Sequence, residues 1–269
     1  MPADIPRIDS RQNPRVKHLV KLRDGATRRK LGQFLIEGAR EVRHALEAGV
    51  RIEEGYFCPE LFVDVDASTA LVERAREAGA ALTELSSGAF EKVSLREGAD
   101  GILAVGLAEE AALDSLELPE EALLLVVEAV EKPGNLGALL RTADAAGVHA
   151  VICCDPVTDR YNPNVIRSSQ GLVFALPLAV ASVEETTNFC RRRRIRLLAT
   201  TPYSETDYWA ADFRGACAVL LGGEKDGLSP ALLDAADARL RIPMAGQADS
   251  LNVSTAAAVV LFEAVRQRG

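Results

Sequence analysis

Apolar positions in the first part of the chain alternate between short runs typical of strands and longer runs with helical spacing. The strand-like runs are residues 32–38, 52–58, 81–85 and 101–107. Between them, residues 39–49, 67–79 and 86–94 carry apolar side chains at helical spacing, and a further helix is predicted over 14–23. This pattern predicts a small N-terminal α/β domain.

The alternation restarts at Ala122, after an acidic stretch over residues 108–121. Strands are predicted over 122–130, 149–154, 195–200 and 216–223, helices over 134–147, 163–171 and 183–194, and the chain closes with the segment 238–244 and a helix over 253–267. Strands that alternate with helices are typical of a parallel sheet covered on both faces. We therefore predict an α/β fold with an N-terminal domain over 1–108, a linker over 109–120 and a C-terminal domain over 121–269.

Composition narrows the class of protein. The 269 residues are 48% apolar and 26% charged, which excludes a disordered or fibrous chain. No apolar run reaches the roughly 18 residues of a membrane span, and the N-terminus has no apolar signal core. The five cysteines show no Cys-x-x-Cys spacing, which disfavours a disulfide scaffold or a thiolate metal site. A cytoplasmic protein without a bound metal is expected.

Charge is unevenly distributed along a chain whose formal net charge is −8. Residues 1–51 hold 12 basic and six acidic side chains, and the basic ones include Arg28, Arg29 and Lys30. Such a segment can bind a polyanion, or it can be an ordinary solvated helix face. A second basic run, Arg191–Arg194 plus Arg196, lies at the end of a predicted helix. It can complement the helix dipole there, and it can also contact phosphate.

Three segments of the C-terminal half carry polar side chains that exceed local structural needs. In residues 131–148, Asn135 lies near a helix start, where it could be an N-cap, and Arg141 interrupts a run of apolar neighbours. Because burying a lone arginine is costly, Arg141 calls for an anionic or hydrogen-bonding partner. No nucleotide-binding glycine signature accompanies these residues.

The second segment, residues 220–244, runs from an apolar strand into Gly222, Gly223 and Glu224. Glycines at the carboxyl end of a strand allow close approach of a ligand, although Ser229 and Pro230 explain part of the segment as a capped helix start. The third segment, residues 249–265, places polar residues at the start of an apolar helix. These are Ser250, Asn252, Ser254 and Thr255, more than a single cap requires.

Taken together and in this order, the three segments resemble the motifs of the SpoU/TrmH family of the SPOUT superfamily, which are RNA ribose 2′-O-methyltransferases. The N-terminal domain, with the sequence RRKLGQFLIEGAREVRHAL over residues 28–46, resembles the RNA-binding substrate domain of ribosomal-RNA members. That domain has a ribosomal-protein-like α/β fold. The resemblance implies a C-terminal domain with a deep trefoil knot, S-adenosyl-L-methionine as cosubstrate, no metal, and a homodimer formed through the catalytic domain.

Site residues follow from the same resemblance. The catalytic set it implies is Asn135, Arg141, Glu224, Ser250 and Asn252, and the cofactor set is Thr200, Gly222, Gly223, Ile242, Met244 and Leu251. Lys225 is a departure, because many members have glycine at that position. Arg28, Arg29 and Lys30 are candidate phosphate contacts.

The resemblance implies methyl transfer to a ribose 2′-hydroxyl, with ribosomal RNA of the large subunit favoured over transfer RNA. DNA is excluded as a substrate because it lacks that hydroxyl. A cationic Arg141 would hold a phosphate and stabilise the developing oxyanion. Two other classes remain open: a non-catalytic RNA-binding paralogue, and a nucleotide-dependent enzyme on an ordinary Rossmann sheet.

Overall fold

The computed structural model describes residues 5–109 and 112–269 and divides into two compact units. The first contains the described residues up to 109 together with residues 160–175, and the second contains the remainder. The stretch 160–175 lies, in sequence, inside the segment predicted to be the C-terminal domain, yet it packs with the N-terminal unit. Among the described residues, no helix is long and apolar enough to cross a membrane.

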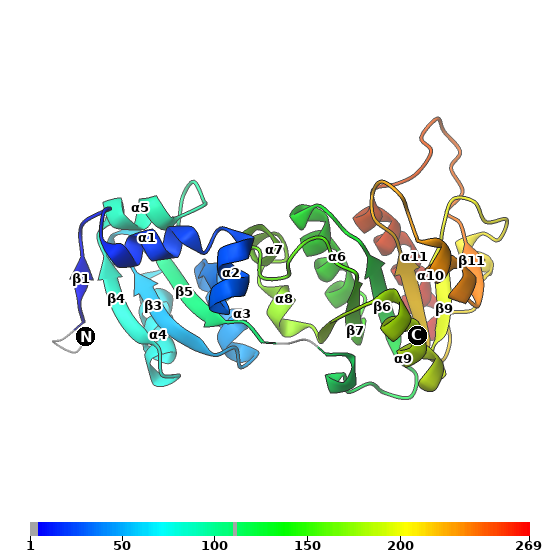
Figure 1. Cartoon of the computed structure of the whole chain (residues 1–269), viewed down its shortest axis with the longest axis horizontal. Helices are drawn as coiled ribbons and strands as arrows, with labels where there is room; N and C mark the ends of the chain where they lie inside the picture. The colour runs from blue at the N-terminus through cyan, green and yellow to red at the C-terminus, as the bar shows by residue number, and fades with distance from the viewer. Residues whose placement is uncertain (1–4, 110–111) are drawn as a thin grey trace. The chain divides into compact units, whose positions relative to one another are not determined.

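A five-stranded mixed sheet organises the N-terminal unit, in the order β1-β4-β3-β5-β2 (Figure 1). Its strands are β1 (Arg7–Ile8), β2 (Gln33–Glu37), β3 (Ile52–Phe57), β4 (Ala81–Leu85) and β5 (Ile102–Leu107). Its helices are α1 (Pro14–Lys21), α2 (Gly25–Leu31), α3 (Ala39–Glu47), α4 (Val65–Glu77), α5 (Ser87–Val93), α7 (Pro163–Ser168) and α8 (Leu172–Ala175), with a 3-10 turn η1 (Pro59–Leu61). Strands β2 and β5 are antiparallel, as are β3 and β5, whereas β4 is parallel to both β1 and β3.

Helices α1 and α5 cover one face of this sheet. Val16 and Leu19 of α1 and Phe90 of α5 join Leu35 and Leu103 in one buried apolar cluster. The segment 160–175 contributes aromatic side chains next to strand β2. The ring of Phe34 stacks on Tyr161 at 4.1 Å between centroids and on Phe174 at 5.7 Å. These contacts fix the segment to the N-terminal unit.

A six-stranded, fully parallel sheet organises the C-terminal unit, in the order β11-β9-β10-β6-β7-β8. Its strands are β6 (Leu123–Glu128), β7 (Ala150–Cys154), β8 (Leu178–Ala181), β9 (Arg196–Thr200), β10 (Cys217–Leu221) and β11 (Ala238–Leu240). Its helices are α6 (Pro133–Ala145), α9 (Val183–Arg192), α10 (Pro230–Ala235) and α11 (Val253–Arg268), with 3-10 turns η2 (Leu113–Ser115) and η3 (Tyr208–Ala210). The parallel arrangement confirms the prediction.

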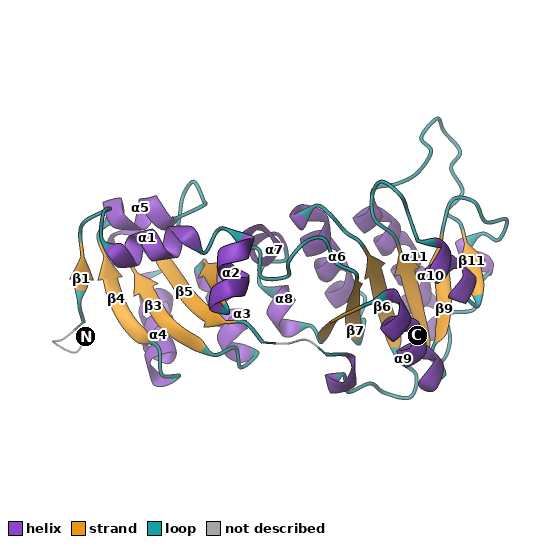
Figure 2. Ribbon diagram, viewed as in Figure 1, coloured by secondary structure: helices purple, strands orange, loops and turns teal. Residues whose placement is uncertain are grey.

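Strand β6 shows why helices lie on both faces of this sheet (Figure 2). All six of its residues are buried, and successive side chains of a strand point to opposite faces. Leu124 and Val126 join Phe189 of α9 and Leu232 of α10 in one cluster. The alternate residues of β6 face the other side, where α11 packs against α6 and β10. A strand buried on both faces reads as a continuous apolar run, which is how the sequence reveals it.

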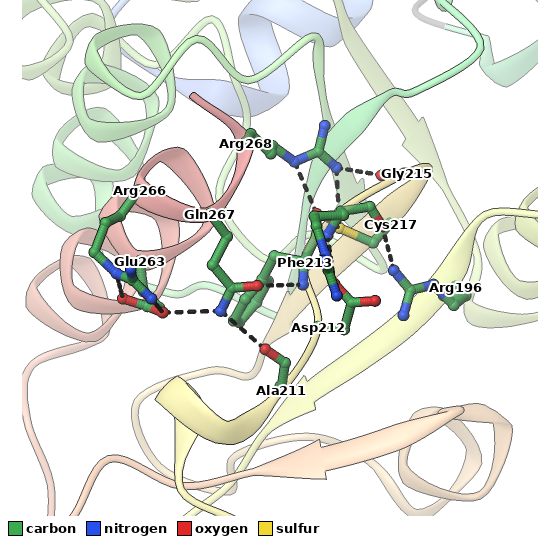
Figure 3. Close-up of polar contacts among 11 residues, drawn as sticks. Arg196, Ala211, Asp212, Phe213, Gly215, Cys217, Glu263, Arg266, Gln267 and Arg268 are labelled. Atoms are coloured by element: carbon green, nitrogen blue, oxygen red, sulfur yellow. Dashed lines mark hydrogen bonds and ion pairs between the residues drawn. The ribbon is translucent and has the colours of Figure 1, made fainter.

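Polar contacts fix the carboxyl end of α11 (Figure 3). The guanidinium of Arg268 donates to the Phe213 carbonyl at 2.8 Å and to the Gly215 carbonyl. Gln267 accepts from the Phe213 amide at 3.0 Å and donates to the Ala211 carbonyl at 2.9 Å. The last helix is therefore tied to the chain that leads into β10.

The structure confirms the predicted helices and strands and adds, besides the three 3-10 turns, four short helices and strands that the pattern missed. These are β1, α2, α8 and β8. Helix α2 has the sequence GATRRKL, which lacks an apolar stripe, and Asp24 caps it by accepting from the Thr27 amide at 2.7 Å. Capping and tertiary packing, rather than periodicity, define such short elements.

Candidate active site at the carboxyl edge of the parallel sheet

The candidate residues gather where parallel strands end. Strands β11, β9, β10 and β6 are consecutive neighbours in the sheet and run in the same direction. Their carboxyl ends therefore lie at one edge, which is where open α/β sheets bind ligands. The residues at or beyond those ends include Thr200, Gly222 and Ile242. In Figure 1 the long loop between β11 and α11, drawn in orange, rises from this edge.

A hydrogen-bonded triad connects all three predicted motifs. The Asn135 side-chain amide donates to Glu224 Oε1 at 2.5 Å. Its carbonyl oxygen, Oδ1, accepts from Asn252 Nδ2 at 3.2 Å. Three residues that are 89 and 117 positions apart in the chain thus form one network. Asn135 therefore uses both ends of its side-chain amide, one as a donor and one as an acceptor.

The cap interpretation is wrong for Asn135 and right for Asn252. Helix α6 has Lys132 as its N-cap, so Asn135 lies inside the first turn and its side chain turns to Glu224. Asn252 caps α11 by accepting from the Ser254 amide at 3.0 Å and still donates to Asn135. A single side chain therefore performs the structural and the network role.

The environment of Glu224 keeps its carboxylate charged. Partial burial acts to raise the pKa of Glu224, but the hydrogen bond from Asn135 and backbone N–H groups outweigh it, so the pKa lies below its usual value. One of those N–H groups is that of Glu131, 3.3 Å from Oε2. Glu224 is thus an acceptor that positions the amide of Asn135 and the loop before α6.

The structure places Arg141 on α6, six residues beyond Asn135, which corresponds to about 9 Å along the helix axis. Its side chain is exposed, and no hydrogen bond or ion pair to another described residue is seen. The expectation that Arg141 needs a partner because it is buried is therefore wrong, since the side chain is exposed. Ser250 is also exposed and makes no hydrogen bond with the described residues, so the structure does not bring it into the triad.

Glycine is required at positions 222 and 223 because other backbone atoms lie close to both, from the same turn at Gly222 and from the loop after β6 at Gly223. A Cβ on Gly222 would lie 2.0 Å from the backbone carbon of Gly227, and a Cβ on Gly223 would lie 2.8 Å from the Ala129 carbonyl oxygen. The Gly227 amide closes this turn by donating to the Gly223 carbonyl at 3.1 Å. Lys225 lies exposed within the turn and leaves the triad intact.

Two positioning groups at this edge escaped the sequence analysis. Glu128, at the end of β6 and 5% exposed, accepts from the Ser229 amide at 2.7 Å and so holds the loop after β10. Arg241 donates to Asp207 Oδ1 at 2.8 Å and joins the loop after β9 to the chain before Ile242. Glu128 could have been found from the sequence, because it is a carboxylate at the end of an otherwise apolar strand.

The predicted cofactor residues line the same edge with mixed exposure. Thr200 Oγ1 is buried and has no hydrogen-bond partner within the described structure. Gly222, Ile242, Met244 and Leu251 are half-buried. Over the described ranges, no cluster of three or more His, Cys, Asp or Glu side chains is arranged to hold a metal ion.

The three basic residues predicted to contact phosphate differ in their exposure. Arg28 is only 4% exposed, and its guanidinium donates to the carbonyls of Leu22 at 3.0 Å and Arg23 at 2.8 Å. Arg28 therefore ties α2 to the end of α1, and its prediction as a phosphate contact does not fit the structure. Arg29 and Lys30 are exposed and stay candidates.

Comparison with known proteins decides the family. Residues 122–262 match the model of the SpoU rRNA Methylase family. The chain belongs to this family. Residues 13–104 match the MRM3-like substrate binding domain, which agrees with the position of the N-terminal sheet.

Relatives of this SpoU-family chain match it over nearly its full length. It is 32% identical over 261 residues to a 23S rRNA (guanosine(2553)-2′-O)-methyltransferase of Bacillus subtilis, covering 95% of this chain and 98% of the relative. It is 42% identical to a crystallised RNA 2′-O ribose methyltransferase, with a TM-score of 0.84 and coverage of 97% and 98%. The AdoMet-bound rRNA methyltransferase from Sinorhizobium meliloti is 30% identical, with a TM-score of 0.88 and the same coverage.

Proposed function

We propose that this protein is an S-adenosyl-L-methionine-dependent methyltransferase that modifies a ribose 2′-hydroxyl in large-subunit ribosomal RNA. The observation that carries the proposal is the Asn135–Glu224–Asn252 triad, which joins the three family motifs at one sheet edge. The full-length relative from Bacillus subtilis acts on 23S rRNA, and a further relative was crystallised with AdoMet.

The residues at the carboxyl edge fit a cofactor of this kind. The unpartnered hydroxyl of Thr200 is available to a polar group of a ligand, since a buried hydroxyl normally has a partner. Backbone groups at Gly222, Gly223, Ile242 and Leu251 would hold the ligand, with Met244 beside it. When bound, S-adenosyl-L-methionine supplies the methyl group from its sulfonium centre.

The chain's own contribution to the reaction is orientation and charge. Arg141 is exposed, so its guanidinium is free to hold a phosphate of the RNA bidentately and to stabilise negative charge that develops on the ribose oxygen. Asn135, Glu224 and Asn252 fix the loops around the reacting atoms, and Ser250 lies in the same loop region. Guanidinium is a poor base, so Arg141 acts as a cation throughout.

A trefoil knot and a homodimer belong to the proposal. The knot is supported by the close passage of the turn 222–227 against Ala129 and by the link from Asn252 to Asn135. The dimer is supported by Phe262 and Val265 of α11, which are exposed apolar side chains at 50% and 38%. A cytoplasmic location also belongs to the proposal and is consistent with a ribosomal RNA substrate.

The reaction and substrate class are tested together by labelling. The protein is incubated with methyl-labelled S-adenosyl-L-methionine and either unmodified 23S rRNA or unmodified transfer RNA, and the RNA is then hydrolysed with alkali. Label in alkali-resistant dinucleotides of 23S rRNA is expected, because 2′-O-methylation blocks cleavage at that ribose. Label only in transfer RNA would overturn the proposed substrate class. Cofactor binding without methyl transfer to any RNA or ribosomal particle would overturn the proposed reaction and indicate a non-catalytic RNA-binding protein.

A further inference from the structure

Two aromatic rings stand exposed on the loop that follows β9. This loop, residues 201–210, is called the aromatic loop below. Tyr203 is 94% exposed and Trp209 is 52% exposed, and Tyr208 meets Trp209 edge-on with ring centroids 5.0 Å apart. The rings of Tyr203 and Trp209 are therefore accessible to a ligand.

The backbone of the aromatic loop is held firmly. The Thr201 amide donates to the Leu240 carbonyl at 2.8 Å, the Arg241 amide donates to Thr206 at 2.8 Å, and the Tyr208 amide donates to Arg241 at 2.9 Å. The side chains of Arg241 and Asp207 form an ion pair at 2.8 Å along the same seam. The exposure of the rings is therefore a property of an ordered loop.

The position of the aromatic loop links it to the proposed active site. It begins directly after Thr200, and its partner strand continues through Arg241 into Ile242. Both flanking residues are in the proposed cofactor set. The aromatic loop therefore leaves the sheet at the same edge at which methyl transfer is proposed.

We propose that the aromatic loop is a stacking platform for unpaired nucleobases of the RNA substrate, close to the ribose that is methylated. This inference rests on the proposed function and adds the mode of substrate recognition. Sequence-specific RNA binding mostly targets unpaired nucleotides, whose bases stack on aromatic side chains. A rigid ring loses little conformational entropy on stacking, which a preformed loop exploits.

The composition of the loop favours RNA over a protein partner. The residues between the two rings are Ser204, Glu205, Thr206, Asp207 and Tyr208. The loop therefore presents Tyr203 alone and the Tyr208–Trp209 pair, with polar side chains between them. A protein interface needs a contiguous apolar core inside its polar rim. Single bases stack on single rings and need no such continuity.

Trp209 allows a direct test because it is the only tryptophan in the chain. Titration of the protein with a short unpaired RNA oligonucleotide is expected to quench its intrinsic tryptophan emission, since a base stacked on indole deactivates the excited state. The same RNA annealed to its complement, and inorganic polyphosphate, are the controls for pairing and for charge. Equal quenching by all three, or none by the unpaired RNA, would overturn the proposal.

Substitution of Tyr203 separates stacking from general binding. Tyr203→Leu is expected to weaken binding of 23S rRNA by roughly 5- to 150-fold, the range for loss of one stacked base. Tyr203→Phe keeps the ring and is expected to bind like the unchanged protein, and both variants should bind S-adenosyl-L-methionine with unchanged affinity. Equal RNA affinity of Tyr203→Leu, or a change in oligomeric state without a change in RNA affinity, would contradict the stacking role.

The two proposals fail in distinguishable ways. If the unchanged protein neither binds S-adenosyl-L-methionine nor methylates RNA, the proposed function is wrong. If it methylates 23S rRNA and Tyr203→Leu does so with the same KM and the same RNA affinity, only the stacking platform is wrong.

Discussion

Replacing Asn135 with aspartate tests the triad without changing the shape of the side chain. In the unchanged protein, the amide of Asn135 donates to Glu224 at 2.5 Å and accepts from Asn252 at 3.2 Å. Aspartate can still accept from Asn252, but it presents a second carboxylate to Glu224. The substitution therefore exchanges an attraction for a repulsion at one pair of atoms.

The expected cost follows from two contributions. Loss of a hydrogen bond to a charged acceptor costs about 1.5–3 kcal/mol. Two like charges about 4 Å apart repel by about 1 kcal/mol in water and about 4 kcal/mol near a protein surface. Because burial reduces screening, the half-buried state of Glu224 favours the upper part of that range. Asn135→Asp should therefore destabilise the C-terminal unit by about 4–7 kcal/mol at neutral pH. Asn135→Ala, which adds no charge, should cost only about 1.5–3 kcal/mol.

The pH dependence of this stability difference tests the partnership with Glu224 more specifically than its size at neutral pH. The lowered pKa of Glu224 stabilises the unchanged fold above the unfolded-state pKa, and that contribution is lost as the pH falls through the folded-state value. In Asn135→Asp the facing carboxylates raise the pKa of the pair, so the penalty is present at neutral pH and is relieved as the pH falls. The stability gap between the two proteins should narrow from pH 7 towards about pH 4.5.

Denaturant unfolding of the three proteins across this pH range measures the gap. The matched variant Asn135→Ala, which adds no carboxylate, should not show the same narrowing. If Asn135→Asp and Asn135→Ala cost the same at every pH, or if the gap widens in acid, Glu224 is not the partner of residue 135 in solution.

Two other predictions concern packing and RNA binding. Gly222→Ala places a Cβ 2.0 Å from the backbone of Gly227, so it should cost about 1–3 kcal/mol and weaken S-adenosyl-L-methionine binding. Calorimetry that finds stability and binding unchanged would refute the tight packing within the turn 222–227. Arg28→Ala removes a buried donor to two carbonyls and should lower the free energy of unfolding by about 1.5–3 kcal/mol, whereas Arg29→Ala should change it by less than about 0.5 kcal/mol and weaken RNA binding. The opposite order in thermal melts and RNA titrations would contradict the division between buried and exposed arginines.

The sheet of the C-terminal unit could be predicted because its central strands are continuous apolar runs. Residues 123–128 are apolar up to Glu128, and a strand buried on both faces needs that composition. Elements held by caps and tertiary contacts gave no such signal. Strand β8, four residues long at the end of its sheet, and helix α2, with three basic residues in its last turn, were missed for that reason.

The site could be predicted only in part. Asn135, Glu224 and Asn252 were proposed from motif resemblance, and the structure joins them, but the local pattern alone permits Asn135 to be an N-cap. Its true role depends on a loop 89 residues away. The burial of Arg28 likewise depends on the turn between α1 and α2, because a run of three basic residues does not reveal which of them faces inward.

Arg141 is proposed to support methyl transfer, so its replacement tests the proposed function of this sheet edge directly. The direct measurement is the single-turnover rate of label transfer to 23S rRNA by the unchanged protein and by Arg141→Ala, with S-adenosyl-L-methionine affinity measured in parallel. Because Arg141 is exposed and bonded to no described residue, the variant should fold and bind the cosubstrate normally and lose on the order of 10²–10³ in rate. Transfer at the unchanged rate by Arg141→Ala would contradict the role of this edge of the sheet in the reaction.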